Sequence, residues 1–166
     1  KVTAILATHG HFDHVLAAGE LQLSLEILNQ EQFPLYIFEE DMFLVNRLKE
    51  TAQHFLNHTP RTLPIKHFSY LKEGELIIGE FNFEVLHTPG HTPGSCCFYF
   101  PEETTIFTGD TVFKEAIGDY SHNYSNKVQL MSSVKRILDL DEGTIIYPGH
   151  GEDTLVQMEK LYSNTE

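Results

Sequence analysis

Four short polar turns, each at the end of an apolar run, constrain this fold more than any other feature. They cover residues 8–14, 87–95, 107–111 and 147–151, and the last three contain glycine beside a histidine or an aspartate. A side chain at a strand-to-turn junction projects over the edge of its sheet, where loops from different strands converge. The sequence therefore predicts strands whose ends carry one functional site.

The first turn reads Thr-His-Gly-His-Phe-Asp-His and holds four metal-binding side chains: His9, His11, Asp13 and His14. Imidazole and carboxylate groups are good ligands for borderline divalent metals. Four such groups are too many for one tetrahedral ion that also keeps an open coordination position. The segment therefore predicts two metal ions side by side, with further ligands downstream.

Each of the other turns supplies one more candidate ligand, directly after a glycine: His91, Asp110 and His150. We expect one ion to be held by His9, His11 and His91, and the second by Asp13, His14 and His150. Asp110 is expected to bridge the pair, because a carboxylate has two oxygens. Two ions roughly 3.5–4 Å apart would lower the pKa of a bridging water and polarise a carbonyl or phosphoryl oxygen. The expected nucleophile is this hydroxide, not a serine or cysteine side chain.

The hydrophobic pattern mixes βα units with a run of adjacent strands, which predicts a single α/β domain over residues 1–166. Helices are expected at Val15–Leu28, Glu39–Leu56, Asn126–Leu140 and Thr154–Tyr162. Strands are expected at Val2–Ala7, Leu35–Phe38, Leu76–Ile78, Phe81–Leu86, Cys96–Phe100, Thr105–Phe107 and Thr144–Tyr147. A loop is expected at Thr59–Pro64, and Ser125 or Asn126 is expected to cap the helix that follows it.

The net charge of the chain limits its possible binding partners, and its cysteines indicate its cellular compartment. The chain has 24 acidic and 11 basic residues and a formal net charge of −13, which argues against binding to nucleic acid or to an anionic membrane. We expect a small-molecule substrate instead. Cys96 and Cys97 are neighbours that point to opposite faces of a strand, so we expect no disulfide between them. Reduced thiols fit a cytoplasmic protein.

The seven candidate ligands, in this order, resemble those of the metallo-β-lactamase superfamily. The words Thr-Pro-Gly-His-Thr-Pro-Gly-Ser, Phe-Thr-Gly-Asp-Thr and Tyr-Pro-Gly-His-Gly are similar to those of its glyoxalase II-like branch. The resemblance covers essentially the whole chain. It implies a metallo-β-lactamase-like αβ/βα four-layer sandwich, and a hydrolase that uses two divalent metal ions, usually zinc and sometimes iron or manganese.

The resemblance also implies the reaction. A bridging Asp110 resembles the thioesterase, lactonase and phosphodiesterase branches, whereas true β-lactamases usually carry Cys or Ser near this position. We therefore expect cleavage of a small ester or thioester, with hydroxyacylglutathione hydrolase-like thioesterase activity favoured. Asp13 is the expected catalytic residue, because it would both bind the second ion and hold the hydroxide by a hydrogen bond.

Two other functions stay open. Some members of the superfamily resemble persulfide dioxygenases, which use one iron held by the first set of ligands. The chain could also be an inactive, truncated metal-binding fragment, because family members carry roughly 50 or more residues before the first histidine motif. We expect the N-terminal strands of the sandwich to be missing, and the sheet edge left exposed to allow oligomers to form.

The loop after Gly118 departs from the family pattern. Related enzymes commonly place Arg or Lys at the next position, which here is Asp119. An acid there would repel the carboxylates of glutathione. Three candidate substrate contacts follow in this loop: Tyr120, His122 and Tyr124. Among the other histidines, His87 is a candidate for orienting a ligand, and three are expected to have no role at the site: His54, His58 and His67.

Overall fold

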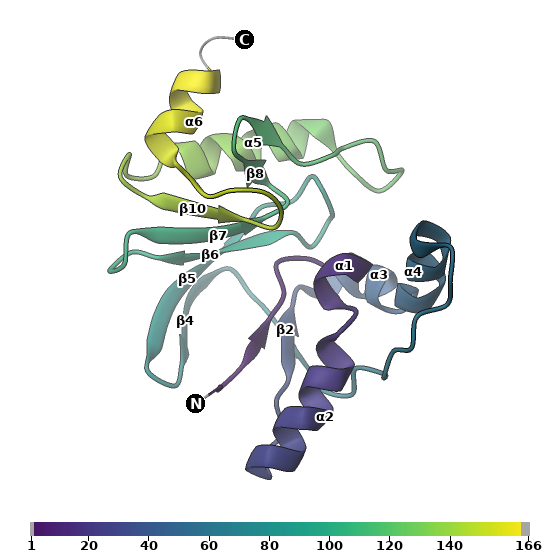
Figure 1. The fold of residues 1–166 in the computed structure, drawn as a ribbon. Helices are drawn as coiled ribbons and strands as arrows, with labels where there is room; N and C mark the ends of the chain where they lie inside the picture. Colours follow the sequence, from purple (N-terminus) through teal and green to yellow (C-terminus); the bar gives the residue numbers. More distant parts are fainter. Residues whose placement is uncertain (1, 164–166) are drawn as a thin grey trace. The chain divides into compact units, whose positions relative to one another are not determined.

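The computed structural model describes residues 2–163. The chain divides into two compact units, Lys1–Leu71 and Lys72–Glu166, each with its own sheet and core. In Figure 1 the first unit runs from purple to blue and the second from teal to yellow. The expectation that residues 1–166 form a single domain stays a prediction.

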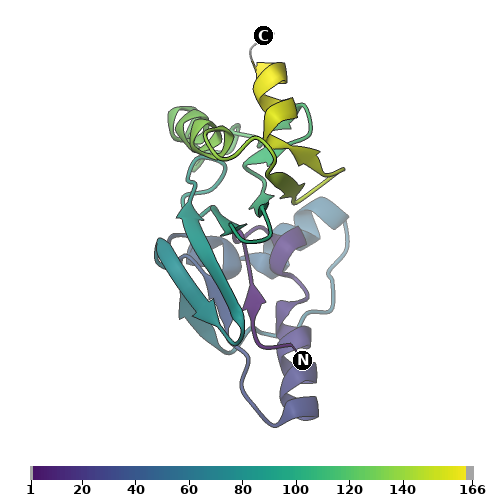
Figure 2. The ribbon, with the colours of Figure 1, turned by 90° about the vertical axis from the view of Figure 1, so that its left-hand side faces the viewer.

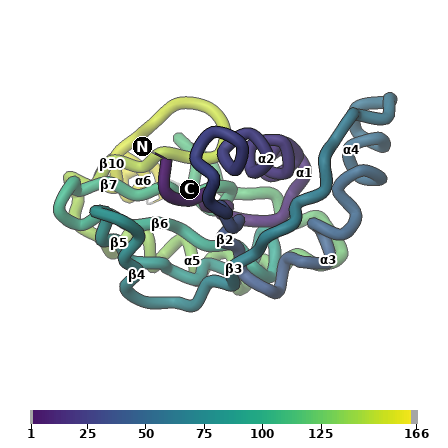
Figure 3. The backbone as a smooth tube through the Cα atoms, turned by 90° about the horizontal axis from the view of Figure 1, so that it is seen from below, coloured from purple at the N-terminus to yellow at the C-terminus, as the bar shows by residue number. Residues whose placement is uncertain are grey.

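Unit 1 is built on a three-stranded parallel sheet in the order β1–β2–β3. Its elements are β1 (Ile5–Leu6), α1 (Phe12–Val15), α2 (Ala18–Asn29), β2 (Leu35–Ile37), the 3₁₀ helix η1 (Glu39–Asp41), α3 (Met42–Val45), α4 (Leu48–Leu56) and β3 (Phe68–Tyr70). The central strand β2 buries Leu35 and Ile37 in the core of the unit. Figure 3 shows the segment from α4 back to β3 as an extended trace, as its two prolines predict.

The helices of unit 1 are shorter than the sequence predicts. The stretch 39–56 is not one helix but three pieces, η1, α3 and α4. Arg47 leaves the helical region with φ −118° and ψ 16°, and its N–H donates to Leu44 O instead of to the residue four positions earlier. This tightened turn ends α3, so the expectation of a continuous helix is wrong. Likewise, the strand expected at Val2–Ala7 is regular only over Ile5–Leu6.

Unit 2 contains a six-stranded sheet in the order β11–β10–β7–β6–β5–β4. Its elements are β4 (Gly74–Ile78), β5 (Phe81–His87), β6 (Cys96–Phe100), β7 (Thr105–Gly109), β8 (Val112–Phe113), β9 (Ala116–Ile117), α5 (Lys127–Leu138), β10 (Ile145–Pro148), β11 (Thr154–Leu155) and α6 (Val156–Ser163). The pair β7–β10 is parallel and the other pairs are antiparallel. Figure 2 shows the long teal strands of this sheet twisting along their length.

Helix α5 packs on one face of this sheet, as its sequence pattern predicts. Its buried residues recur at helical spacing: Leu130, Ser133, Val134, Ile137 and Leu138. Apart from Ser133, these residues form one core with residues from five strands, among them Leu86, Ile106 and Ile146. Asn126 is the N-cap, because its side chain accepts a hydrogen bond from the Gln129 N–H.

Short strands account for what the sequence pattern missed in unit 2. The hairpin β8–β9 and the strand β11 have two residues each, too few for an alternating pattern to be recognised. Residues 154–155 pair with β10, so the final helix begins at Val156 rather than at Thr154. The other strands agree with expectation. Cys96 and Cys97 are both buried, and no disulfide joins them. None of the helices within residues 2–163 has the length and apolar character that a bilayer span requires.

Candidate metal centre

Four of the seven predicted ligands lie in unit 1, in the loop after β1 and the first turn of α1. His11 is the N-cap residue of α1, and its Nδ1 lies 3.1 Å from His9 Nε2. The rings of His9 and His14 are 4.1 Å apart between centroids. Asp13 Oδ2 lies 3.7 Å from His14 Nε2. The single turn of helix therefore gathers three imidazoles and a carboxylate into one group.

A buried carboxylate holds this loop in place. The Gly10 N–H, between the first two histidines, donates to Asp41 Oδ2 at 2.8 Å. A Cβ on Gly10 would lie 2.9 Å from Asp41 O, so the loop fits against η1 only because residue 10 has no side chain. Asp41 could not be predicted from the sequence, because it ends a run of three acids that is typical of a solvated surface. Its neighbours Glu39 and Glu40 are indeed exposed, whereas Asp41 is fully buried.

The other three predicted ligands lie in unit 2, around the carboxylate of Asp110. His91 Nε2 is 3.6 Å and His150 Nε2 is 3.7 Å from the same oxygen, Asp110 Oδ2. Asp110 follows β7, His91 lies in the loop between β5 and β6, and His150 follows β10. Because β5, β6, β7 and β10 are consecutive in the sheet, these turns meet at one edge, as predicted.

These distances suit a bound divalent metal. Two ligand atoms about 2.0–2.2 Å from a tetrahedral ion lie about 3.3–3.6 Å from each other. His91 Nδ1 lies 2.7 Å from the backbone O of Asp119, and a carbonyl only accepts, so Nδ1 carries a proton. With the Asp119 carbonyl on Nδ1, the His91 ring directs Nε2 toward a carboxylate oxygen, where its lone pair can bind a metal ion. Two electron-rich atoms in this arrangement favour a cation between them, and the donor set fits zinc, iron or manganese.

The loop that carries His91 is fixed by the start of α5. Gly90 has φ +139°, and a Cβ there would lie 2.2 Å from Leu130 N in the first turns of the helix. The Asn126 N–H donates to Gly90 O at 2.8 Å, and Ser125 Oγ donates to His91 O at 2.7 Å. The only backbone that passes this close to α5 is one without a side chain, which explains the glycine before His91.

The turn that carries His150 is fixed to the turn that carries Asp110. The Gly149 N–H donates to Gly109 O at 2.8 Å. The β8–β9 hairpin also touches the His150 turn, since Lys114 Nζ pairs with Glu152 Oε2 at 2.6 Å. The hydrogen bond between these exposed groups, together with their opposite charges, raises the pKa of Lys114 and lowers the pKa of Glu152. These contacts between the two turns hold His150 and Asp110 at a fixed distance from each other.

A family model for the metallo-beta-lactamase superfamily matches residues 1–150. The chain belongs to this superfamily. The predicted fold class, a mixed α/β metallo-β-lactamase fold, is thereby confirmed. Most members of this superfamily are metal-dependent hydrolases, and the predicted ligands lie in the part of the chain that the family model matches.

The superfamily relatives of this chain include an enzyme and two solved structures. The chain is 39% identical to the hydroxyacylglutathione hydrolase GloC of Haemophilus influenzae, a match that covers 96% of this chain and 74% of that protein. It is 34% identical to TTHA1623 in a di-iron-bound form, with a TM-score of 0.82, covering 96% of this chain and 75% of that one. It is 32% identical to the BLEG-1 B3 metallo-beta-lactamase, with a TM-score of 0.81 and coverage of 95% and 73%.

The predicted substrate loop of this superfamily member adjoins His91. The backbone of Asp119 holds the His91 ring, a role that no side-chain pattern could reveal. Its carboxylate accepts hydrogen bonds from Ser121 N and Oγ, which lower the pKa of Asp119. His122 stacks on Tyr124 with ring centroids 5.1 Å apart, and Lys127 Nζ lies 4.9 Å from the Tyr120 ring centre. The loop therefore presents aromatic rings, one ammonium and one carboxylate.

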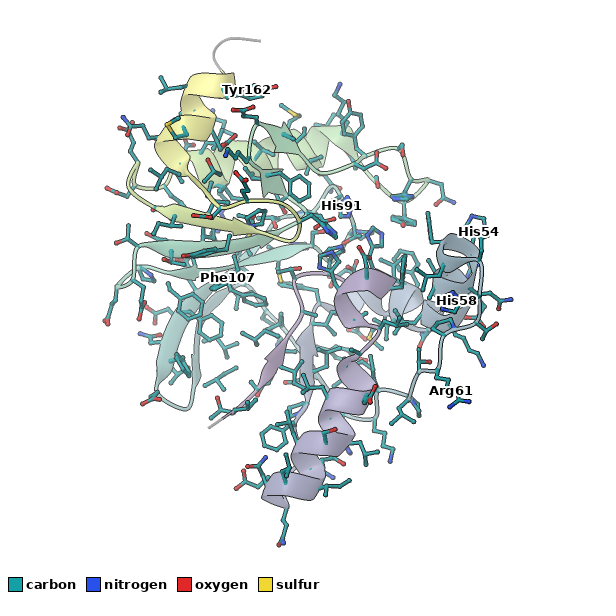
Figure 4. All side chains as sticks on the ribbon, in the orientation of Figure 1. His54, His58, Arg61, His91, Phe107 and Tyr162 are labelled. Atoms are coloured by element: carbon teal, nitrogen blue, oxygen red, sulfur yellow. The ribbon has the colours of Figure 1, made fainter. Side chains whose placement is uncertain are left out.

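The remaining histidines have local partners. His87 Nε2 lies 2.9 Å from the backbone O of Pro93, so its side chain braces the loop that carries His91. His67 Nε2 lies 3.2 Å from Glu26 Oε1. His54 and His58 lie at the end of α4 and just beyond it (Figure 4), and His58 Nδ1 is 3.1 Å from Leu56 O. The expectation that His54, His58 and His67 have no role at the site stays a prediction.

Proposed function

We propose that the protein is a metal-dependent hydrolase that cleaves a small ester or thioester. The observation that carries the proposal is the convergence of His91 Nε2 and His150 Nε2 on one oxygen of Asp110. Membership of the superfamily and the similarity to a hydroxyacylglutathione hydrolase support it.

The proposed ligands of two divalent ions are the seven residues predicted from the sequence: His9, His11, Asp13, His14, His91, Asp110 and His150. Bound ions of this kind lower the pKa of a coordinated water and polarise the acyl carbonyl of the substrate. Zinc is the first choice because imidazoles dominate the set. The di-iron form of TTHA1623 makes iron the metal to compare with it.

The chain's own residues then have separate tasks. Asp13 is proposed to accept a hydrogen bond from the attacking water, since a carboxylate is an acceptor at neutral pH. The Asp119 carbonyl is proposed to keep a proton of His91 on Nδ1, so that Nε2 can bind a metal ion. Tyr120, His122 and Tyr124 are proposed to contact the substrate. Because the Asp119 carboxylate remains ionised, we expect it to disfavour substrates with a carboxylate at that point.

Two other reactions deserve a direct comparison. The similarity to the BLEG-1 B3 metallo-beta-lactamase favours a test of β-lactam hydrolysis. The first set of ligands alone would suit a one-iron persulfide dioxygenase, which consumes oxygen. The ester and thioester reaction is preferred because a second set, Asp13, His14 and His150, is also present.

A substrate panel combined with metal counting tests the proposal. Protein loaded with zinc, iron or manganese is offered aryl esters, acyl thioesters including S-lactoylglutathione, a chromogenic β-lactam, and glutathione persulfide with an oxygen electrode. We expect two ions per chain and turnover of an ester or thioester. His91→Gln should abolish turnover, whereas His58→Gln, an exposed histidine in unit 1, should not. Two bound ions with no ester or thioester turnover would contradict the proposal, and oxygen uptake with one iron would favour the dioxygenase.

A further inference from the structure

Three buried polar side chains lie directly beneath the turns that carry His91 and Asp110. Thr88 is the first residue after β5, Thr111 immediately follows Asp110, and Cys97 lies in β6 between them. All three are 0% exposed. Their neighbours in the core are apolar, among them Leu86, Ile106 and Val112. Burial of polar groups in apolar surroundings lowers the stability of the folded protein unless these groups form hydrogen bonds with each other.

The three side chains do form one hydrogen-bonded cluster, which we call the hydroxyl bridge (Thr88, Cys97 and Thr111). Thr88 Oγ1 lies 3.2 Å from Thr111 Oγ1 and 3.3 Å from Cys97 Sγ. Cys97 Sγ lies 4.0 Å from Thr111 Oγ1 and donates to Thr108 O at 3.6 Å. Burial raises the pKa of the Cys97 thiol to about 12, so the thiol keeps the proton that it donates.

The backbone of each threonine belongs to a different turn. The Thr88 N–H donates to Ser95 O, which closes the loop around His91. The Thr111 N–H donates to Thr108 O, which closes the turn around Asp110. The hydroxyl bridge is therefore a side-chain connection between two turns that are otherwise closed separately. A metal site tolerates deviations of only about 0.2 Å in its ligand distances, so the relative position of these turns matters.

We propose that Thr88 and Thr111 are positioning residues for the metal centre: their hydroxyl bridge sets the spacing of His91 Nε2 and Asp110 Oδ2. This inference rests on the proposed metal site, but not on which substrate is cleaved. Loss of either hydroxyl removes the direct contact between the two threonines and leaves the remaining threonine hydroxyl only its contact with Cys97 Sγ. Such losses of supporting hydrogen bonds typically cost 10–100-fold in metal affinity.

Thr144 offers a matched control. It lies in the same unit, is also 0% exposed, and its Oγ1 has no hydrogen-bond partner among residues 2–163. Thr144→Val therefore removes an equally buried hydroxyl that connects nothing. Thr88→Val and Thr111→Val remove connected ones while nearly keeping the side-chain shape. Thr88→Ser and Thr111→Ser keep the hydroxyl and remove only a methyl group.

The test measures the affinity for Zn²⁺ by competition with a chelator and the visible absorption of the Co²⁺-loaded protein. We expect Thr88→Val and Thr111→Val to lower the affinity about 10-fold or more and to shift the cobalt bands. The double variant should lose little more than either single one, because both break the same bridge. The two serine variants and Thr144→Val should bind like the unaltered protein. Circular dichroism confirms that each variant is folded.

Several outcomes would overturn the inference. Unchanged affinity and an unchanged cobalt spectrum in Thr88→Val would show that the bridge does not position the ligands. An equal loss in Thr144→Val would show that any buried change in this core weakens the site. Intact metal binding without ester or thioester turnover would contradict only the proposed function. A protein that binds neither Zn²⁺ nor Co²⁺ would contradict both.

Discussion

At the scale of single residues, the contact between Gly10 and Asp41 gives the sharpest prediction in unit 1. Asp41→Ala would leave the buried Gly10 N–H without its acceptor, which typically costs about 1–3 kcal/mol of unfolding free energy. We also expect weaker Zn²⁺ binding, because the loop between His9 and His11 would loosen. Urea unfolding and chelator competition measure the two effects.

Two variants control for the charge of Asp41. Asp41→Asn removes the charge but keeps an oxygen that can accept from Gly10, so we expect a smaller loss. Glu40→Ala removes a carboxylate from the same turn, yet that side chain is exposed and should change little. If Glu40→Ala were as damaging as Asp41→Ala, the effect would be one of net charge and not of this hydrogen bond.

The thiol of Cys97 makes the stability of the protein depend on pH. In the folded protein its pKa is raised from 9.0 to about 12 by burial. Above pH 9 the unfolded chain loses this proton and the folded chain keeps it, so the unfolded state binds fewer protons and stability falls as pH rises. The contribution is complete below pH 9 and should decline by about 1 kcal/mol between pH 8 and pH 10.

Urea unfolding of the unaltered protein and of Cys97→Ala across this pH range tests the linkage. Cys97→Ala is expected to be less stable at pH 8, because a buried side chain is shortened, and to lack this part of the decline above pH 9. If the unfolding free energies of the two proteins changed with pH in the same way, Cys97 would not be the cause of the pH dependence.

Residue identity alone predicted the candidate ligands but not their supports. The ligands could be predicted because histidine and aspartate beside glycine at strand ends form a recognisable pattern. Asp41 could not, since an acid in an acidic run is normally solvated and only its tertiary contact with Gly10 distinguishes it. The sequence pattern indicates a role for the carboxylate of Asp119, whereas it is the backbone carbonyl of this residue that contacts His91.

At the scale of elements, the packing of the His91 loop on α5 depends on Gly90. Gly90→Ala would introduce a Cβ 2.2 Å from Leu130 N, at a φ of +139° that side chains rarely adopt. We expect a large loss of unfolding free energy, more than the strain of the backbone alone, which is about 1–3 kcal/mol. Metal affinity should fall with it, because His91 is the next residue.

A matched substitution at Gly74 distinguishes the backbone strain from the clash with α5. Gly74 has a similar φ of +123°, but a Cβ there would meet nothing within 4 Å. Gly74→Ala should therefore show the backbone strain without the clash, and urea unfolding of both variants gives the difference. Equal losses would mean that contact with α5 does not explain the glycine at position 90.

Elements with a strong periodic pattern were predictable, and elements defined by tertiary contacts were not. Helix α5 has its buried residues at regular spacing and an Asn cap, so the sequence determines it locally. The hairpin β8–β9 has two residues per strand and exists through pairing of Val112 with Ile117. The break at Arg47 within residues 39–56 is likewise absent from the hydrophobic pattern, which continues across it.

At the scale of the whole molecule, each unit contributes its own group of predicted ligands, four in unit 1 and three in unit 2. The order of these ligands along the chain predicted the superfamily, because that order follows from the order of the strands and turns. The division into two compact units could not be predicted from the sequence, because the composition does not change around the boundary between Leu71 and Lys72. A core that forms from contacts distant in sequence produces no local change in composition.

Removal of the metal should therefore loosen both units, not one. A ligand that binds only the folded state stabilises it by about 2.7 kcal/mol at 100 times its dissociation constant. We expect a chelator to lower the melting temperature and to speed hydrogen exchange at residues 8–15 in unit 1. Faster exchange is also expected at residues 88–95, 109–111 and 148–151 in unit 2. The distal β4–β5 turn near Gly79 serves as an internal control, because no predicted ligand lies in that hairpin. Faster exchange confined to one unit would mean that the ligands of the other do not bind metal.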